Sequence, residues 1–471
     1  MHARAGLDNE PPAALHRSVR DSRSSGFDES AQNVIRSDVL DAGAAEADAA
    51  TIAASTSTTS DARIRPGYCR RAQATVRAPR LVSALVARAR WRRNGLVAAC
   101  VLAVAILLPL GARVTADRWH DDSLWANSLR SLGGLAVPYD FAIFLRAADD
   151  VRAGDNPYVD PDSVDEHAHA PYAYPPLLAI VLIPATALPD DVSGSSPAGV
   201  LVSLLLIGCV VGTLALLDVR DWRCYPIALL YPPTLENVEY GAIGPVLALL
   251  VALAWRYRDR FGAAAASLGT VIALKVFLWP LVVWLAATRR WRAAVGAAAV
   301  AAALTLGSWA VIGFDGIADY PDLLRRLSDV EAENSYSAYA MLVTLGLPST
   351  LARLAVAAAA LGLLVLGWRV ARRGGDGDRG ALTFTLAAGV VLTPILWLHY
   401  LVLLVVPIAL ARPRLSALWF VPLAMTVFEL LDLYRGWPRG DGWALLSVAA
   451  VVTFVFATAL VRPGRRLAAW L

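Results

Sequence analysis

Ala87-Arg-Ala-Arg-Trp-Arg-Arg93 stands just before the apolar run Leu96–Leu110 in this chain. The basic segment extends further back, because ten arginines and no acid lie between Arg63 and Arg93. Basic residues beside a first transmembrane helix hold that side of the helix in the cytoplasm. No small-residue cleavage site follows the run, so we expect residues 94–113 to form an uncleaved membrane anchor.

Composition extends this expectation to the whole chain. Of the 471 residues, 57% are hydrophobic and 17% charged, whereas soluble domains have about 45–50% apolar and about 25% charged residues. This balance excludes a soluble enzyme. A net charge of +4, without a basic stripe interleaved with aromatic residues, argues against nucleic acid as a partner. The four scattered cysteines form no CxxC pair, which argues against a disulfide framework or a zinc site.

Arginine clusters in the later loops define the predicted topology. Placing all of them in the cytoplasm requires an even number of crossings between neighbouring clusters. The apolar runs then give about twelve spans with both termini cytoplasmic: 94–113, 198–217, 222–235, 241–255, 261–274, 275–288, 293–313, 349–369, 380–395, 397–411, 415–433 and 442–461. Several runs are short, above all the pair at 261–288, so we expect broken or re-entrant helices there.

The domain organisation follows from these spans. Residues 1–93 are expected to be a cytoplasmic tail with a basic end, and its first 61 residues have a disordered composition or reflect a start codon assigned too far upstream. Residues 94–466 form the transmembrane domain, with outer loops at 114–172 and 314–348. The loop 114–172 has eleven acids against four arginines, the opposite balance to the cytoplasmic loops. The apolar segment from Tyr174 to Leu188 is expected to dip into the outer leaflet and return.

The outer loop contains a predicted amphipathic helix that begins near Tyr139. Its apolar face lies at the membrane surface in this prediction, and the charged residues Arg146, Asp149, Asp150 and Arg152 occupy the other face. The apolar positions are Phe141, Phe144, Leu145, Ala148 and Val151. Asp140 stands in the first turn of this helix. It is either a carboxylate that completes the helix start or a general base at the membrane boundary.

Several short motifs, in order along the chain, resemble glycosyltransferase family 87, a family of polytopic GT-C enzymes typified by polyprenol-phosphate-mannose-dependent mannosyltransferases. The motifs are Tyr139-Asp140-Phe141, Gly154-Asp-Asn156-Pro157-Tyr158, Tyr174-Pro175-Pro176 with Pro184, Leu274-Lys275, Asn334-Ser335 and Leu392-Thr-Pro394-Ile-Leu-Trp397-Leu-His399-Tyr400. The resemblance covers about residues 96–461. It departs at Gly241-Ala-Ile-Gly-Pro245, where the family usually has a Gly-Gln-x-Asn-like element, so mannose becomes less certain as the sugar.

The resemblance implies that a sugar, most simply mannose, passes from a polyprenyl phosphate to an envelope glycolipid or lipoglycan acceptor outside the bacterial cytoplasmic membrane. Asp140 would be the catalytic base, and direct attack on a β-linked donor would give an α-linked product by inversion. No obligatory cofactor or metal is expected, and the lipid donor, the acceptor and membrane lipids are the partners.

Lys275 and His399 are the predicted ligands of the donor phosphate. Lys275 is the single lysine among 43 basic residues. A lysine in hydrocarbon costs about 2.5–3.5 kcal/mol on insertion scales, so it normally faces a cavity or a counter-charge, or snorkels to the interface. His399 is either a satisfied interfacial histidine or a hydrogen-bond donor to phosphate or sugar. Further candidate substrate-binding residues are Tyr139, Asn156, Tyr158, Tyr174, Glu236, Glu239, Asn334 and Tyr400.

The weaker candidates also have interpretations without a function. Glu236 and Glu239 would then be exposed acids of a loop, and Asn334 would lie in a solvated loop. His167 and His169 lack further metal ligands nearby, and Asp160-Pro-Asp162 is expected to be a turn. Two other functions stay open: a transporter or flippase of lipid-linked sugars, and a noncatalytic scaffold. A transporter predicts internal repeats and a polar through-path, and a scaffold predicts that Asp140 tolerates substitution. These motifs identify neither the acceptor nor the linkage position nor the oligomeric state.

Overall fold

The computed structural model describes residues 138–164, 171–188, 197–333, 335–373, 377–425 and 442–460. Within these ranges every regular element is a helix, which confirms the all-α class for the described part of the chain. The predicted tail 1–93, the span 94–113, residues 114–137 of the outer loop and part of the span 415–433 lie outside the described residues.

Three long apolar helices correspond to predicted spans. They are α7 (Pro197–Leu216), α13 (Trp291–Val311) and α16 (Ser349–Ala371), each long and apolar enough to cross a bilayer. A rise of 1.5 Å per residue makes a 20-residue helix about 30 Å long, the thickness of the hydrocarbon core. The chain is therefore a multi-pass membrane protein. Because one bent pair adds at most a fourth span to the described helices, the total of twelve stays a prediction.

The break predicted at residues 274/275 is confirmed. Helix α11 (Phe261–Leu274) ends at Lys275, whose backbone is extended, with φ −146° and ψ 100°. The short helices η4 (Val276–Leu278) and α12 (Leu281–Ala287) follow. Neither half is long enough to cross a bilayer alone, so the lysine sits at a bend between two short helices.

The predicted continuous span at 222–235 is wrong. The chain instead forms α8 (Cys224–Leu229) and then α9 (Pro232–Tyr240). Pro232 and Pro233 lack a backbone N–H, so they end the first helix and open the second. Helix α10 (Gly244–Arg256) follows α9 at a bend of 119°. A sharp corner therefore stands where we expected two separate crossings.

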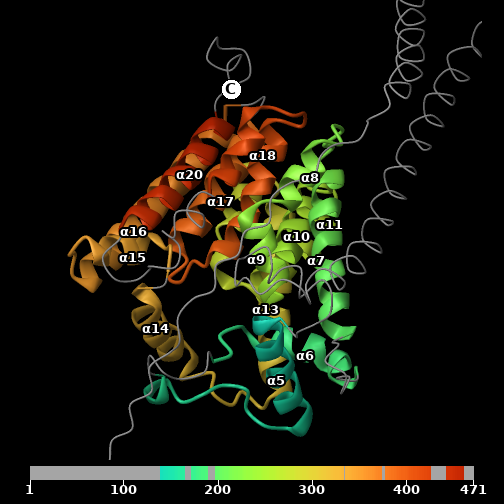
Figure 1. Cartoon of the computed structure of the whole chain (residues 1–471), viewed down its shortest axis with the longest axis vertical. Helices are drawn as coiled ribbons and strands as arrows, with labels where there is room; N and C mark the ends of the chain where they lie inside the picture. Colours follow the sequence, from blue (N-terminus) through green and yellow to red (C-terminus); the bar gives the residue numbers. More distant parts are fainter. Residues whose placement is uncertain are drawn as a thin grey trace, which may run out of the picture. The chain divides into compact units, whose positions relative to one another are not determined.

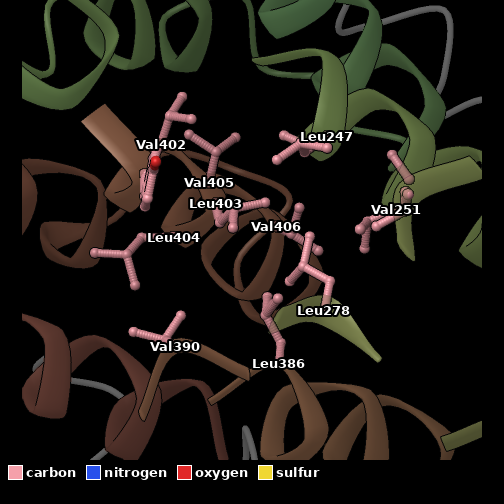
Figure 2. Packing of buried hydrophobic residues seen from close by; sticks show 14 of the residues in the cluster. Leu247, Val251, Leu278, Leu386, Val390, Val402, Leu403, Leu404, Val405 and Val406 are labelled. Carbon is pink, nitrogen blue, oxygen red and sulfur yellow. The ribbon is translucent and has the colours of Figure 1, made fainter. Parts of the chain in front are cut away.

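A segment near the C-terminal end runs through the middle of the buried core. The predicted span 397–411 is divided into η6 (Leu398–Leu404) and α18 (Val405–Ala411), and nearly all its side chains are buried. Figure 2 shows Val402–Val406 between Leu247 and Val251 of α10, Leu278 of η4, and two residues of α17 (Gly377–Leu392). A segment whose side chains are buried on every side has no face left for lipid.

The remaining elements include most of the region predicted to lie outside. They are α5 (Tyr139–Ala153), η2 (Pro161–Ser163), α6 (Pro176–Leu182), η3 (Ile183–Ala187), α14 (Tyr320–Val330), η5 (Glu331–Glu333), α15 (Ala338–Thr344), η7 (Ala417–Ala424) and α20 (Gly442–Leu460). Helices α5, α6 and α14 lie toward the lower end of Figure 1, away from α8 and α18. The turn predicted at Asp160-Pro-Asp162 is present, with the Asp160 side chain accepting from the Asp162 amide.

Helix α5 has the predicted amphipathic pattern but a different environment. Phe141, Phe144 and Ala148 are buried as expected, and Ile143 and Ala147 are buried as well. This face packs on α6, η3 and α9, so protein covers the surface where we expected lipid headgroups. The arrangement fixes the start of α5, and with it Asp140, against the helical core.

A charged network joins two loops to the N-terminal end of α17. The Asp378 carboxylate accepts hydrogen bonds from Trp284, Arg258 and Arg290. The Arg290 side chain also forms an ion pair with Asp259. The carboxylate and the two arginines that contact it are only 20–28% exposed, so these contacts are poorly screened by water. The network therefore joins the α10–α11 and α12–α13 loops to α17.

Replacing Asp378 with Ala is expected to destabilise the protein by about 2 kcal/mol, because two guanidinium groups and an indole N–H lose their acceptor together. Thermal unfolding of the detergent-solubilised protein measures this loss. Asp149→Ala is the matched control, since Asp149 pairs with Arg152 on a helix where both side chains are at least half exposed. Equal midpoints for the two variants would show that the network adds nothing.

Candidate functional site

Asp140 is the second residue of α5. It stands two positions after Pro138, the N-cap residue of this helix. Its side chain is 21% exposed, and Oδ2 lies 3.9 Å from Nε2 of His399. The sequence separates these two residues by more than 250 positions. The packing of α5 on α9, and of α9 on η6, brings them together.

His399 lies between two carboxylates. It stands in the first turn of η6 and is 4% exposed, with Nδ1 3.6 Å from Oε2 of Glu236 on one side and Asp140 on the other. Within the described residues neither ring nitrogen makes a hydrogen bond. A buried imidazole with such neighbours is suited to hold or pass a proton, or to donate to a bound ligand.

The exposed-loop interpretation of Glu236 and Glu239 is wrong, because both lie within α9. Glu236 is 6% exposed and faces His399, whereas Glu239 is partly buried one turn later. The two prolines at the start of α9 extend the helix over residues that looked like a turn in the sequence. Sequence spacing alone did not show which of these two acids is buried. The structure shows that it is Glu236.

Lys275 lies between two aromatic rings. Its Nζ is 3.6 Å from the centre of the Tyr174 ring and 4.4 Å from that of Tyr400, and it donates a hydrogen bond to the Tyr400 hydroxyl. Phe277 stacks on Tyr400, with ring centroids 5.9 Å apart. Ring faces attract a cation, so this cage offsets part of the cost of removing the ammonium from water.

His399 and Lys275 both affect the pKa of the Asp140 carboxyl group. Burial raises the pKa of Asp140 above its ordinary value, and the neighbouring His399 and Lys275 act in the opposite direction. Glu236 adds a smaller upward contribution to the same pKa. His399 contacts Asp140 and Glu236, and Tyr400 contacts both His399 and Lys275. We call the four residues Asp140, His399, Lys275 and Glu236 the Asp140 cluster.

Asn237 holds the cluster's backbone, and sequence reasoning missed it. Its fully buried amide donates to the carbonyl oxygens of Pro233 and His399 and accepts from the backbone N–H of Gly244. One side chain thus joins α9, the start of α10 and η6. No sequence signal distinguished this asparagine from the acids beside it.

Ser335 also holds backbone in place, at the segment just before η6. Its hydroxyl accepts hydrogen bonds from the amides of Leu396 and Ser337, and the Tyr336 amide donates to the Leu396 carbonyl. Residues 335–337 therefore fix the turn that leads into His399. Asn334, the residue that we predicted to bind substrate, lies outside the described residues.

The segment 241–245, which lacks the amides of the family pattern, keeps two glycines that pack closely against neighbouring elements. Gly241 ends α9 with φ +69°, and a Cβ there would lie 2.7 Å from Cβ of Phe141. A Cβ at Gly244 would lie 2.7 Å from the Asn237 side chain and 3.0 Å from the His399 carbonyl. Both glycines permit backbone contact with the elements that carry Asp140 and His399.

Replacing Gly241 with Ala is expected to displace the start of α5 and lower activity at least tenfold, since a misplaced catalytic group costs rate steeply. Gly154→Ala is the control. It also has positive φ, at +87°, but its added Cβ would meet nothing within 4 Å. Both variants should lose about 1 kcal/mol of stability from backbone strain. Equal activity in the two variants would contradict a positioning role for the Gly241 contact.

The other predicted residues lie around the cluster or apart from it. Tyr139 is 52% exposed, which separates its side chain from the buried cluster. Asn156 accepts a hydrogen bond from the Tyr158 amide, and the Tyr158 hydroxyl donates to the Tyr174 carbonyl. Glu166, His167 and His169 lie outside the described residues. Among the described residues, no group of three or more His, Cys, Asp or Glu has metal-binding geometry.

The chain is similar in sequence to known proteins. Residues 172–407 match the family described as Glycosyltransferase family 87. The segment includes Glu236, Lys275 and His399, while Asp140 precedes it. A polyprenol-phosphate-mannose-dependent alpha-(1-2)-phosphatidylinositol mannoside mannosyltransferase of Mycolicibacterium smegmatis is 26% identical over 333 residues, covering 62% of this chain and 75% of the relative. No solved structure matches the chain.

Proposed function

Because the chain belongs to glycosyltransferase family 87, we propose that it transfers a hexose, with mannose as the first candidate, from a polyprenyl-phosphate sugar to an envelope glycolipid or lipoglycan. The reaction takes place on the extracytoplasmic side of the bacterial cytoplasmic membrane, and both termini are cytoplasmic. The arginine-rich loops support this orientation. The printed activity of the mycobacterial relative supports the donor and the sugar.

The observation that carries the proposal is the meeting of Asp140, His399 and Lys275 in one cluster. Glycosyl transfer from a lipid phosphate needs a base for the acceptor hydroxyl and a cationic partner for the leaving phosphate. A buried carboxylate supplies the first need, and a caged ammonium beside a histidine supplies the second. The same groups would have no common purpose in a scaffold.

In the proposed reaction, an acceptor hydroxyl attacks the anomeric carbon of the donor. The new C–O bond forms as the bond between the anomeric carbon and the phosphate oxygen breaks, and the electron pair of that bond leaves with the polyprenyl phosphate. Asp140 takes the hydroxyl proton, while Lys275 and His399 stabilise the phosphate. One displacement inverts the anomeric centre, so a β-linked donor gives an α-linked product.

The residues near the cluster have supporting roles in this proposal. Tyr174 and Tyr400 hold the Lys275 ammonium, and Tyr400 accepts one of its three N–H donors. Glu236 lies against His399 and is positioned to orient the imidazole or accept from a sugar hydroxyl. The amides expected at 241–245 are absent. A sugar other than mannose would therefore be recognised by different contacts at residues 241–245.

The experiment compares donor classes in membranes that contain the full chain. With polyprenyl-phosphate-sugar synthesis blocked, added nucleotide sugar alone should give no product, whereas added polyprenyl-phosphate mannose should restore transfer. The same assay with EDTA should retain activity, because no obligatory metal or other cofactor is part of the proposed chemistry. Transfer from nucleotide sugar under the block would contradict the lipid-donor proposal, and loss of activity in EDTA would contradict the metal-free mechanism.

A further inference from the structure

A second candidate site adjoins the turn that follows α5. A cavity of about 650 Å³ separates the turn at residues 156–162 from the start and exposed face of α14. This volume is within the roughly 300–1,000 Å³ of small-molecule sites. Its walls include Asn156, Tyr158, Asp162 and Asp319. The mechanism proposed above does not use this space.

The cavity has a rigid aromatic wall. Tyr158 lines it and stacks on Trp309, with ring centroids 5.1 Å apart and an interplanar angle of 18°. Tyr320 lies edge-on to Tyr158 at 5.3 Å and also lines the cavity. The turn below is fixed by the hydrogen bond from the Tyr158 amide to Asn156. An aromatic wall with a fixed amide beside it presents both an apolar surface and a hydrogen-bonding group to a ligand.

The charge of the lining selects the kind of ligand. Five aspartates and two arginines line the cavity, and one of these arginines, Arg325, is paired with Asp322 at 2.8 Å. Such a negative lining repels phosphate and carboxylate groups. Carboxylates instead accept hydrogen bonds from hydroxyls, and a tyrosine ring packs against the apolar face of a ligand. The chemistry favours a neutral molecule with many hydroxyls.

One residue connects this cavity to the cluster. The hydroxyl of Tyr158, in the cavity wall, donates to the backbone carbonyl of Tyr174 at 2.8 Å. The ring of Tyr174 lies 3.6 Å from the Lys275 ammonium. Tyr174 therefore links the cavity wall to Lys275, because its carbonyl contacts Tyr158 and its ring contacts the ammonium.

From this arrangement we propose that the cavity binds the neutral glycan part of the acceptor and orients its reactive end toward Asp140. The inference rests on the proposed function for the identity of the reaction. It adds that the acceptor is recognised through sugar hydroxyls, while anionic groups are kept for Lys275. The neutral glycan of the acceptor and the phosphate of the donor thus bind at different sites, which Tyr174 links.

Direct binding of a soluble probe tests the proposal without requiring turnover. Saturation-transfer NMR of the detergent-solubilised full chain with an α-linked mannobiose should show binding. Asp319→Leu and Asp162→Leu, one on each wall, should each weaken it by about tenfold, because a lost charged acceptor costs about one such factor. The matched control is Asp315→Leu, which changes an exposed aspartate of the same loop that does not line the cavity. Its affinity should be unchanged.

A second probe separates the glycan site from the phosphate site. Inorganic phosphate should bind equally to the wild type and to the two cavity variants, whose folding is checked by thermal unfolding. Absence of mannobiose binding to the wild type, equal binding to all variants, or loss of phosphate binding in the cavity variants would overturn the inference. Mannobiose binding by a protein that consumes no lipid donor would refute the proposed function and leave the glycan site standing.

Discussion

Asp140→Asn is expected to slow sugar transfer about 10³-fold, because a positioned general base contributes typically 10²–10⁴-fold. The amide has nearly the shape of the carboxylate but cannot take a proton from the acceptor hydroxyl. The helix start should therefore survive, with His399 and Lys275 in place. Initial rates in membranes with matched amounts of protein measure the effect.

Asp149→Asn is the control for this variant. Asp149 is on the same helix, where its half-exposed side chain pairs with Arg152. It removes the same charge at a short distance without touching the cluster, so transfer should continue at the wild-type rate. An Asp140→Asn enzyme that transfers as fast as Asp149→Asn would end the general-base mechanism and favour a scaffold.

The pH dependence of the rate provides an independent test of Asp140. Burial raises its pKa above the ordinary value of 3.8. The base form is present above that raised pKa and is lost as the pH falls through it. The rate should therefore decline on an acidic limb placed above pH 3.8. In Asp140→Asn the residual rate should lack this limb, and an unchanged limb would assign it to another group.

Lys275→Met is expected to lower kcat/KM for the lipid donor by about 10²–10³-fold, the loss typical of removing one group that stabilises developing charge. Methionine keeps length and apolar contact between the two tyrosine rings but supplies no charge. Because a buried lysine costs free energy, insertion and folding should be no worse than in the wild type. Steady-state kinetics with varied donor, together with thermal unfolding, separate the two effects.

Tyr400→Phe is the companion variant for Lys275. It removes the hydroxyl that accepts from Nζ and keeps the ring that covers the ammonium. A loss of at most about tenfold is expected, as for one hydrogen bond. If Lys275→Met left donor use unchanged, or if Tyr400→Phe were the more damaging change, the ammonium would not be the phosphate ligand.

Sequence patterns predicted the elements well where a single period or a single breaker decided them. The long apolar runs at 198–217, 293–313 and 349–369 correspond to α7, α13 and α16. The break at Lys275 followed from two apolar runs that were each too short to cross a bilayer. Local composition was sufficient in these cases, because helix length and polarity are local properties.

Prediction failed where tertiary packing decides the environment. The span at 222–235 contains Pro232 and Pro233, and the chain uses them to start a short helix that buries Glu236. The apolar face of α5 was correctly placed but packs on α6 rather than lipid, which hydrophobic periodicity does not distinguish. Asn237 was missed because all three of its partners are backbone groups, which have no sequence pattern.

The site was predicted in part. The resemblance selected Asp140, Lys275 and His399 from short motifs, and the structure places all three in one cluster. Their separation by more than 100 residues each gives no local signal for the contact. The corner at Gly241 and Gly244, where α9, α10, α5 and η6 meet, brings Asp140 and His399 together. The Tyr400 hydroxyl accepts from Lys275 and so joins the lysine to the same region.

The most direct test of the central claim follows both products with purified full-length protein in lipid nanodiscs. Given β-linked polyprenyl-phosphate mannose and a glycolipid acceptor, the protein should release one polyprenyl phosphate for each sugar transferred, and NMR should identify an α-linked product. This outcome is predicted for one displacement at the Asp140 cluster. A β-linked product, or a donor that stays intact in the presence of acceptor, would contradict the account.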